Sequence, residues 1–247
     1  MTDFTHEDLH GSRFEDVDLR GARFHNVDLT GAKIRGALLV DLDVHGEVDN
    51  LRINEVDVGP LIEAELNRRH PERAKLRPSD VDGFREAWAV IERSWPPTVE
   101  RARRLAPELL HERVEGEWSF TETLRHLVFV VDAWVKRAVL GDPSPYAALD
   151  LPHTEMPDEP NVPRDRDARP TLDEVLALRA DRTTVVREVL AGLTEEVLAG
   201  NTDPISGPGY PPGATYPVRE CLEIVVIEEW EHRLFAERDL AVLESRS

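Results

Sequence analysis

The feature that most constrains the fold of this chain is a five-residue repeat near its start. Small or apolar residues such as Ala22 and Ala32 often stand two positions before a large apolar one. The large residues recur at every fifth position, as Phe4, Leu9, Phe14, Leu19, Phe24, Leu29, Ile34, Leu39 and Val44. This period fits neither a strand nor an α-helix. It predicts a coil that turns a corner every five residues and stacks its large side chains in an inward ladder.

The repeat resembles the pentapeptide-repeat family, whose members form a right-handed quadrilateral β-helix. With the four repeats per coil of that family, the array makes about two coils, which is short for an independent solenoid. Residues 48–54 are expected to close the stack with a final strand or two. We expect residues 1–58 to form this first domain.

The charge of the repeat segment allows two roles. Residues 1–58 hold 13 acidic and 6 basic side chains, a net charge of −7. Some pentapeptide-repeat proteins present an acidic rod to DNA-binding enzymes, and the sign of the charge fits that role, but the short length does not. A structural cap or a module that recruits a protein partner is favoured.

The whole chain carries a net charge of −19, which argues against nucleic-acid binding through a basic patch and against binding to anionic membranes.

A proline-rich segment, residues 59–78, follows the repeats and is predicted to be a linker with one short helix that starts at Pro60. From residue 79 to 245 the apolar residues follow a helical period. The first long helix meets Trp95-Pro96-Pro97, where we expect the chain to kink or restart.

Local signals mark the starts of the other three helices. Capping boxes at Ser119–Glu122 and Thr171–Glu174 open the second and third, and Pro217 suits the first turn of the fourth. The connections 141–170 and 201–216 are long and are expected to form a mobile rim. Four amphipathic helices with two long connections describe a four-helix bundle.

A candidate metal site combines residues of the second and fourth helices. Glu228 and His232 are four residues apart, so their side chains share one helix face. If the two helices pack together, His126 supplies a third donor. Two histidines and one glutamate are a known ligand set for catalytic zinc and leave a fourth position open. Spacing alone does not separate Glu228 from Glu229.

The alternative for Glu228 and His232 is a plain surface pair, worth ~0.3 to 0.5 kcal/mol. The apolar run Cys221–Ile227 instead indicates burial of this helix. A buried carboxylate without a cation costs several kcal/mol, which favours a metal.

The motif from Trp118 to His126, and the ending from Glu228 to Leu240, resemble the DinB-like (DinB/YfiT) superfamily over residues 80–245. The resemblance implies an up-down-down-up four-helix bundle with His126, Glu228 and His232 as metal ligands. Many members carry a histidine in place of the glutamate, and the set found here is similar to that of mycothiol-dependent maleylpyruvate isomerase.

The same resemblance implies an S-transferase that activates a low-molecular-weight thiol on a divalent metal, zinc first and nickel as the alternative. Mycothiol is the expected thiol if the source is actinobacterial, which the scarcity of lysine permits. No catalytic residue beyond the ligands is assigned. One alternative is a metal-dependent hydrolase, for which Glu122 is the one candidate base. The other is a non-enzymatic, stress-related scaffold in which the repeats recruit a partner.

The remaining expectations follow from composition. The single cysteine, Cys221, rules out an internal disulfide and is expected to be a small core residue. No secretion signal and no apolar run near ~20 residues is present, so a reducing cytoplasm is expected, with no membrane contact. A small-molecule thiol and an electrophile are the expected partners, and a homodimer is left open.

Overall fold

The computed structural model describes residues 3–46, 48–154 and 156–246, which belong to two compact units, Met1–Val48 and Asp49–Ser247. The described part of the first unit contains no assigned strand or helix, whereas the second is built mainly from helices. The division between the units falls before the domain limit predicted after residue 58.

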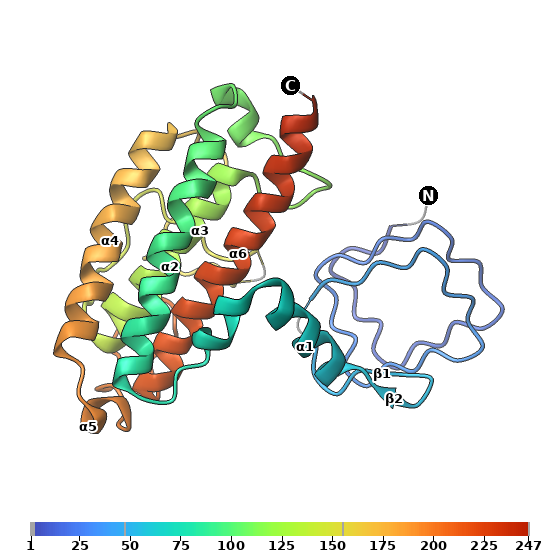
Figure 1. Cartoon of the computed structure of the whole chain (residues 1–247), viewed down its shortest axis with the longest axis horizontal. Coiled ribbons are helices and arrows are strands. Elements are labelled where there is room, and N and C mark those ends of the chain that lie inside the picture. The colour runs from blue at the N-terminus through green and yellow to red at the C-terminus, as the bar shows by residue number, and fades with distance from the viewer. Residues whose placement is uncertain (1–2, 47, 155, 247) are drawn as a thin grey trace. The chain divides into compact units, whose positions relative to one another are not determined.

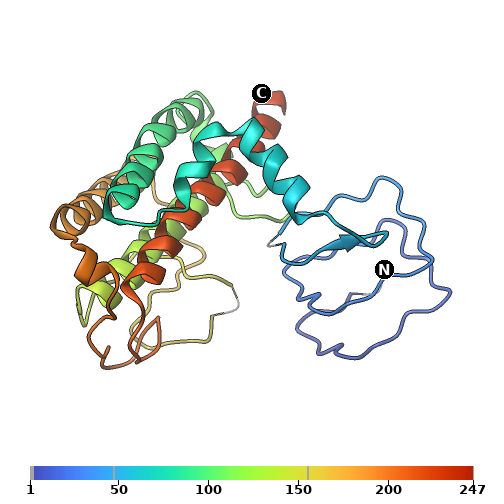
Figure 2. The same ribbon diagram turned by 60° about the horizontal axis from the view of Figure 1, so that its bottom comes forward.

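Corners recur every five residues in the first unit, as the repeat predicted. Positive φ angles occupy every fifth position from His6 to Gly46. Each of these residues is glycine, asparagine, aspartate or histidine, which tolerate the left-handed conformation best. At some corners a backbone hydrogen bond closes the turn, such as that of 3.0 Å from Ser12 N to Leu9 O. The chain therefore winds through successive coils (Figure 2).

The large side chains of the repeat are exposed, contrary to the predicted inward ladder. Their exposed fractions range from 42% at Leu9 to 68% at Ile34. An array of about two coils gives each side chain few layers above or below it, so stacking buries little of its surface. The quadrilateral β-helix stays a prediction that the repeat and its corners support.

A short hairpin and a helix open the second unit. Strands β1 (Arg52–Ile53) and β2 (Val56–Asp57) pair antiparallel across a two-residue turn in which both residues have positive φ. This is the geometry of a type I′ turn. Helix α1 (Gly59–Arg69) follows with Pro60 in its first turn, and a 3-10 helix, η1 (Pro71–Leu76), comes next. The short helix predicted here is confirmed.

Four long helices form the bundle: α2 (Val81–Ala102), α3 (Phe120–Val131), α4 (Leu172–Gly192) and α6 (Val218–Arg246). In Figure 1, α2 and α6 run upward while α3 and α4 run downward, which is the predicted up-down-down-up order. Helices α2 and α3 both pack against α6, and α3 also packs against α4. Two smaller elements, η2 (Pro107–His111) and α5 (Glu195–Leu198), lie in the connections.

Capping boxes set the starts of α3 and α4, as predicted. The Ser119 hydroxyl accepts from Glu122 N, and the Glu122 carboxylate accepts from Ser119 N. Thr171 and Glu174 make the same reciprocal pair. Each box satisfies two N–H groups that a helix start leaves without partners. These boundaries therefore depend on local sequence alone.

Helix α2 passes through Pro96 and Pro97 and does not restart, contrary to one form of the prediction. A proline inside a helix removes a backbone donor and costs roughly 3 kcal/mol. Trp95, Thr98 and Ala102 are buried on both sides of the prolines. This packing outweighs the local preference and carries the helix to Ala102.

Helix α3 continues into a π-helical segment, η3 (Asp132–Val139), for which the sequence carries no signal that we recognised. π-helical turns are rare in proteins, and those that occur often lie near functional sites. The segment holds two charged side chains in the interior, Asp132 at 0% and Arg137 at 1% exposure. Gly141, with a φ of 70°, lies two residues after the end of η3.

Buried arginines fasten the two long connections that were predicted as a mobile rim. Arg125 Nε donates to the Leu149 carbonyl at 2.8 Å and its other nitrogens reach two later carbonyls of residues 141–170. Arg137 donates to the carbonyls of Gly207 and Pro211 at 2.8 and 3.2 Å. The rim is therefore tied to α3 and η3.

The apolar core lies among the four long helices. Trp88, Trp95 and Trp230 belong to it and are 4% to 7% exposed. Cys221 is fully buried, and burial raises the pKa of its thiol to about 11, so it stays protonated at neutral pH. Across the described residues, no helix combines the length and apolar character needed to cross a membrane.

Candidate metal centre

His126, the first predicted ligand, lies in the middle of α3, where every residue is buried. Its Nδ1 lies 2.9 Å from the carbonyl oxygen of Leu151, in the connection after η3. A carbonyl oxygen only accepts, so Nδ1 carries the proton and Nε2 keeps its lone pair. The ring therefore offers one ligand nitrogen, Nε2.

The other two predicted ligands come from successive turns of α6. His232 Nε2 lies 2.9 Å from Glu228 Oε2, and His126 Nε2 lies 3.5 Å from the same oxygen. One ligand atom from each of the three residues lies within 4.8 Å of the others. The packing of α3 on α6 thus brings together the three side chains that the sequence singled out.

The neighbours of Glu228 are engaged elsewhere. Glu229 is 3% exposed and pairs with Arg179 of α4 at 2.8 Å. The pKa of Arg73 in η1 is raised first by its hydrogen bond with Glu63, and the charge of Glu231 adds a smaller effect in the same direction. Spacing left the choice between Glu228 and Glu229 open, and the structure places Glu228 beside the histidines.

The electrostatics of the cluster suit a cation. Burial raises the pKa of Glu228, but the neighbouring His126 and His232 side chains outweigh burial and hold this pKa well below its usual range. Burial lowers the pKa of His126. Within the described chain, no lysine or arginine nitrogen lies within 4.0 Å of the Glu228 carboxylate. A carboxylate and two imidazoles without a basic partner fit a divalent ion such as zinc or nickel.

Aromatic rings enclose the cluster. The Trp118 ring stacks on His232 with 5.8 Å between centroids and lies 4.5 Å from the His126 ring. Phe129 and Phe235 stand 6.0 and 5.9 Å from the same two imidazoles. Such apolar walls strengthen charge interactions inside a site. Trp118 entered the sequence-based prediction only as part of a family motif, because nothing in the local sequence indicates contact with His232, more than 100 residues later.

Glu122, the base considered for a hydrolase, is occupied. Its carboxylate accepts from Arg113 at 2.5 and 3.0 Å and from Ser119 N at 2.9 Å. Burial raises the pKa of Glu122, but these hydrogen bonds outweigh burial and lower it. The group is therefore an ionised structural carboxylate.

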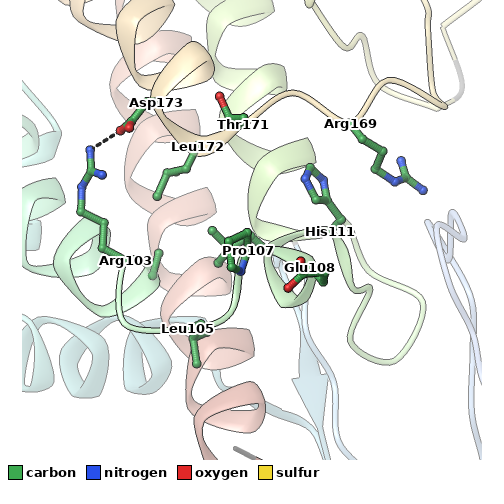
Figure 3. A pocket seen from close by; sticks show the side chains of 11 residues that line it. Arg103, Leu105, Pro107, Glu108, His111, Arg169, Thr171, Leu172 and Asp173 are labelled. Atoms are coloured by element: carbon green, nitrogen blue, oxygen red, sulfur yellow. Dashed lines mark hydrogen bonds and ion pairs between the residues drawn. The ribbon is translucent and has the colours of Figure 1, made fainter.

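Two cavities lie apart from the candidate ligands. One, of about 410 Å³, is formed by the end of α2, by η2 and by the start of α4. Figure 3 shows the ion pair of Arg103 with Asp173 in its lining, together with His111 and Arg169. The other, of about 390 Å³, is lined mainly by residues of α2 and α4. Neither is lined by any of the three candidate ligands.

The bundle order and the convergent histidines and glutamate define a helical-bundle protein with a candidate metal centre. The family model of the DinB superfamily matches residues 91–236, and the chain belongs to this superfamily. The model of pentapeptide repeats matches eight copies over residues 2–39. No curated protein and no solved structure gives a match. Both family assignments made from the sequence are confirmed.

Proposed function

We propose that the chain is a metal-dependent enzyme that transfers a low-molecular-weight thiol to an electrophilic substrate. His126, Glu228 and His232 would hold the divalent ion. The observation that carries the proposal is the convergence of these three donors, in which the Glu228 carboxylate has no lysine or arginine partner among the described residues. A divalent ion at such a site lowers the pKa of a coordinated thiol and makes it nucleophilic near neutral pH.

The chain's own groups prepare the site for this chemistry. The carbonyl of Leu151 selects the His126 tautomer with a free Nε2. His232, whose Nε2 lies 2.9 Å from Glu228 Oε2, helps to keep this carboxylate ionised. Trp118 covers one side of the cluster and limits the access of water.

A thiol substrate is favoured over water because of what surrounds His126. Hydrolysis calls for a general base within reach of the attacking water. Glu122, one turn before His126, is committed to Arg113 and to the helix cap. A thiol, with an ordinary pKa of about 8.5, needs a smaller pKa shift than water to ionise on a metal and so depends less on such a base.

Elemental analysis of protein purified without a metal-binding tag tests the ligand set. We expect about one equivalent of zinc or nickel in the wild type. Glu228→Gln and His232→Ala should lose it. Glu231→Gln, on the same helix and with the same change of chemistry, should retain it. An assay with mycothiol and a model electrophile should then show loss of the electrophile only when both thiol and metal are present.

Three outcomes would contradict the proposal in different ways. Full metal content in Glu228→Gln would remove the ligand assignment. Metal-dependent loss of substrate without thiol would favour a hydrolase. Failure to bind zinc at neutral pH would leave a helical bundle with a buried acid, and the scaffold hypothesis would lead.

A further inference from the structure

Two buried acids, Asp132 and Asp150, are called here the acid pair. Asp150 directly precedes Leu151, whose carbonyl contacts the His126 ring. Both side chains of the acid pair are 0% exposed. Asp132 accepts from Arg182 Nε and Nη2 at 2.8 and 2.6 Å and pairs with Lys136 Nζ at 3.2 Å. Among the described residues, neither carboxyl oxygen of Asp150 receives a hydrogen bond. The neighbour of Asp150 is the Asp132 carboxylate itself.

The acid pair holds one proton at neutral pH. An ionised carboxylate that is buried without a donor costs several kcal/mol, so Asp150 is the protonated member and donates to Asp132. Burial, followed by the charge of Asp132 and the hydrogen bond with it, raises the pKa of Asp150 to about 9. The single negative charge rests on Asp132, where Arg182 and Lys136 neutralise it.

Three consecutive residues of the connection are bound to α3 and η3. Arg125 Nε holds the carbonyl of Leu149 at 2.8 Å. The side chain of Asp150 is buried and faces the Asp132 carboxylate. The carbonyl of Leu151 meets His126 Nδ1 at 2.9 Å. The Leu151 carbonyl oxygen, which orients the His126 imidazole, therefore follows two residues, Leu149 and Asp150, that are themselves held in place.

We propose that Asp150 is a positioning residue for His126: its hydrogen bond to Asp132 places the Leu151 carbonyl against Nδ1 and so fixes the tautomer that presents Nε2 as a ligand. Groups that orient ligating histidines in this way matter for metal affinity. The inference rests on the proposed metal-dependent function, but its first test needs no metal.

The test compares Asp150→Asn, which keeps a neutral donor of the same shape, with Asp150→Ala, which has none. Proton–nitrogen NMR spectra of the metal-free protein at pH 7 report the tautomer of each histidine, and His126→Gln assigns the signal. The wild type and Asp150→Asn should show the Nδ1–H tautomer of His126, and Asp150→Ala a mixture. The matched control is Asp181→Ala, which removes an exposed acid that also pairs with Arg182 at 2.7 Å and should change nothing.

Zinc affinity, measured by competition with a chelator, is the second readout. It should fall about 10- to 100-fold in Asp150→Ala and change by less than about 3-fold in Asp150→Asn. If Asp150→Ala does not fold, the same test is made by raising the pH of the wild type, because Asp150 loses its proton above pH of about 9. Above that pH the Nδ1–H tautomer of His126 should be lost in the wild type and kept in Asp150→Asn.

The outcomes separate this inference from the proposed function. A folded Asp150→Ala with the wild-type tautomer and wild-type zinc affinity would overturn the role of Asp150 while leaving the metal site intact. Equal tautomer loss in Asp150→Asn and Asp150→Ala would overturn the role of the hydrogen bond. A tautomer change confined to Asp150→Ala, in a protein that binds no zinc, would support the positioning of His126 and refute the metal-dependent function.

Discussion

Replacing Asp150 by asparagine removes one buried titration, and proton linkage sets the size of the effect on stability. The folded pKa of Asp150 is raised to about 9, by burial first and by Asp132 second, whereas the unfolded value is near 3.9. Between these values the folded chain keeps a proton that the unfolded chain has released. The contribution of Asp150 is therefore most favourable below pH of about 4 and is lost as the pH rises towards about 9, at about 1.4 kcal/mol per pH unit.

Asparagine does not titrate, so the two proteins should diverge as the pH rises. The unfolding free energy of Asp150→Asn minus that of the wild type should increase by about 3 kcal/mol between about pH 5.5 and about pH 8. Urea unfolding followed by circular dichroism at constant ionic strength measures this difference. Other titrating groups are common to both proteins and cancel in the subtraction. A difference that does not change with pH would refute the assignment of the proton to Asp150.

Other predictions concern single elements of the fold. Arg182→Met leaves Asp132 buried without its bidentate partner and should lower the unfolding free energy by about 3 to 5 kcal/mol; Arg187→Met breaks an exposed pair and should cost less than about 1 kcal/mol. Urea unfolding of both tests the contrast, and equal losses would contradict it. Ser119→Ala should cost about 1 kcal/mol in the same assay, and most of that should return in Ser119→Asp. Gly21→Val forces a β-branched residue to a φ of 73°; it should speed amide exchange in the repeat unit alone, and unchanged rates would argue against the left-handed corner.

Much of the fold follows from signals that act over a few residues. The boxes that begin at Ser119 and Thr171 open α3 and α4 where the sequence places them. In the repeats, residues such as Gly21 and Asn26 stand at the corners because their types tolerate positive φ. These features need no knowledge of distant parts of the chain, which is why they could be predicted.

The predictions that failed or stayed open depend on distant packing. The cost of Pro96 is local, but the burial of Trp95 that outweighs it comes from the rest of the bundle. Glu228 and Glu229 differ by one step around the helix, and the packing of α6 against α3 places Glu228 beside the histidines, while Glu229 lies against Arg179 of α4. Neither contact has a signature in the surrounding sequence.

In the candidate metal centre, too, some features follow from local sequence and others depend on distant packing. Its ligands lie on regular helices, where the four-residue spacing of Glu228 and His232 is enough to indicate a shared face. The group that orients His126 is a main-chain oxygen, which any residue type could supply. Its place depends on the side chain of the preceding residue, Asp150, bound to a second buried acid. A substitution of Leu151 leaves the orienting oxygen in the chain, whereas the replacement of Asp150 by alanine should release the segment that carries it. The position most sensitive to substitution beside this centre is therefore one that touches no ligand.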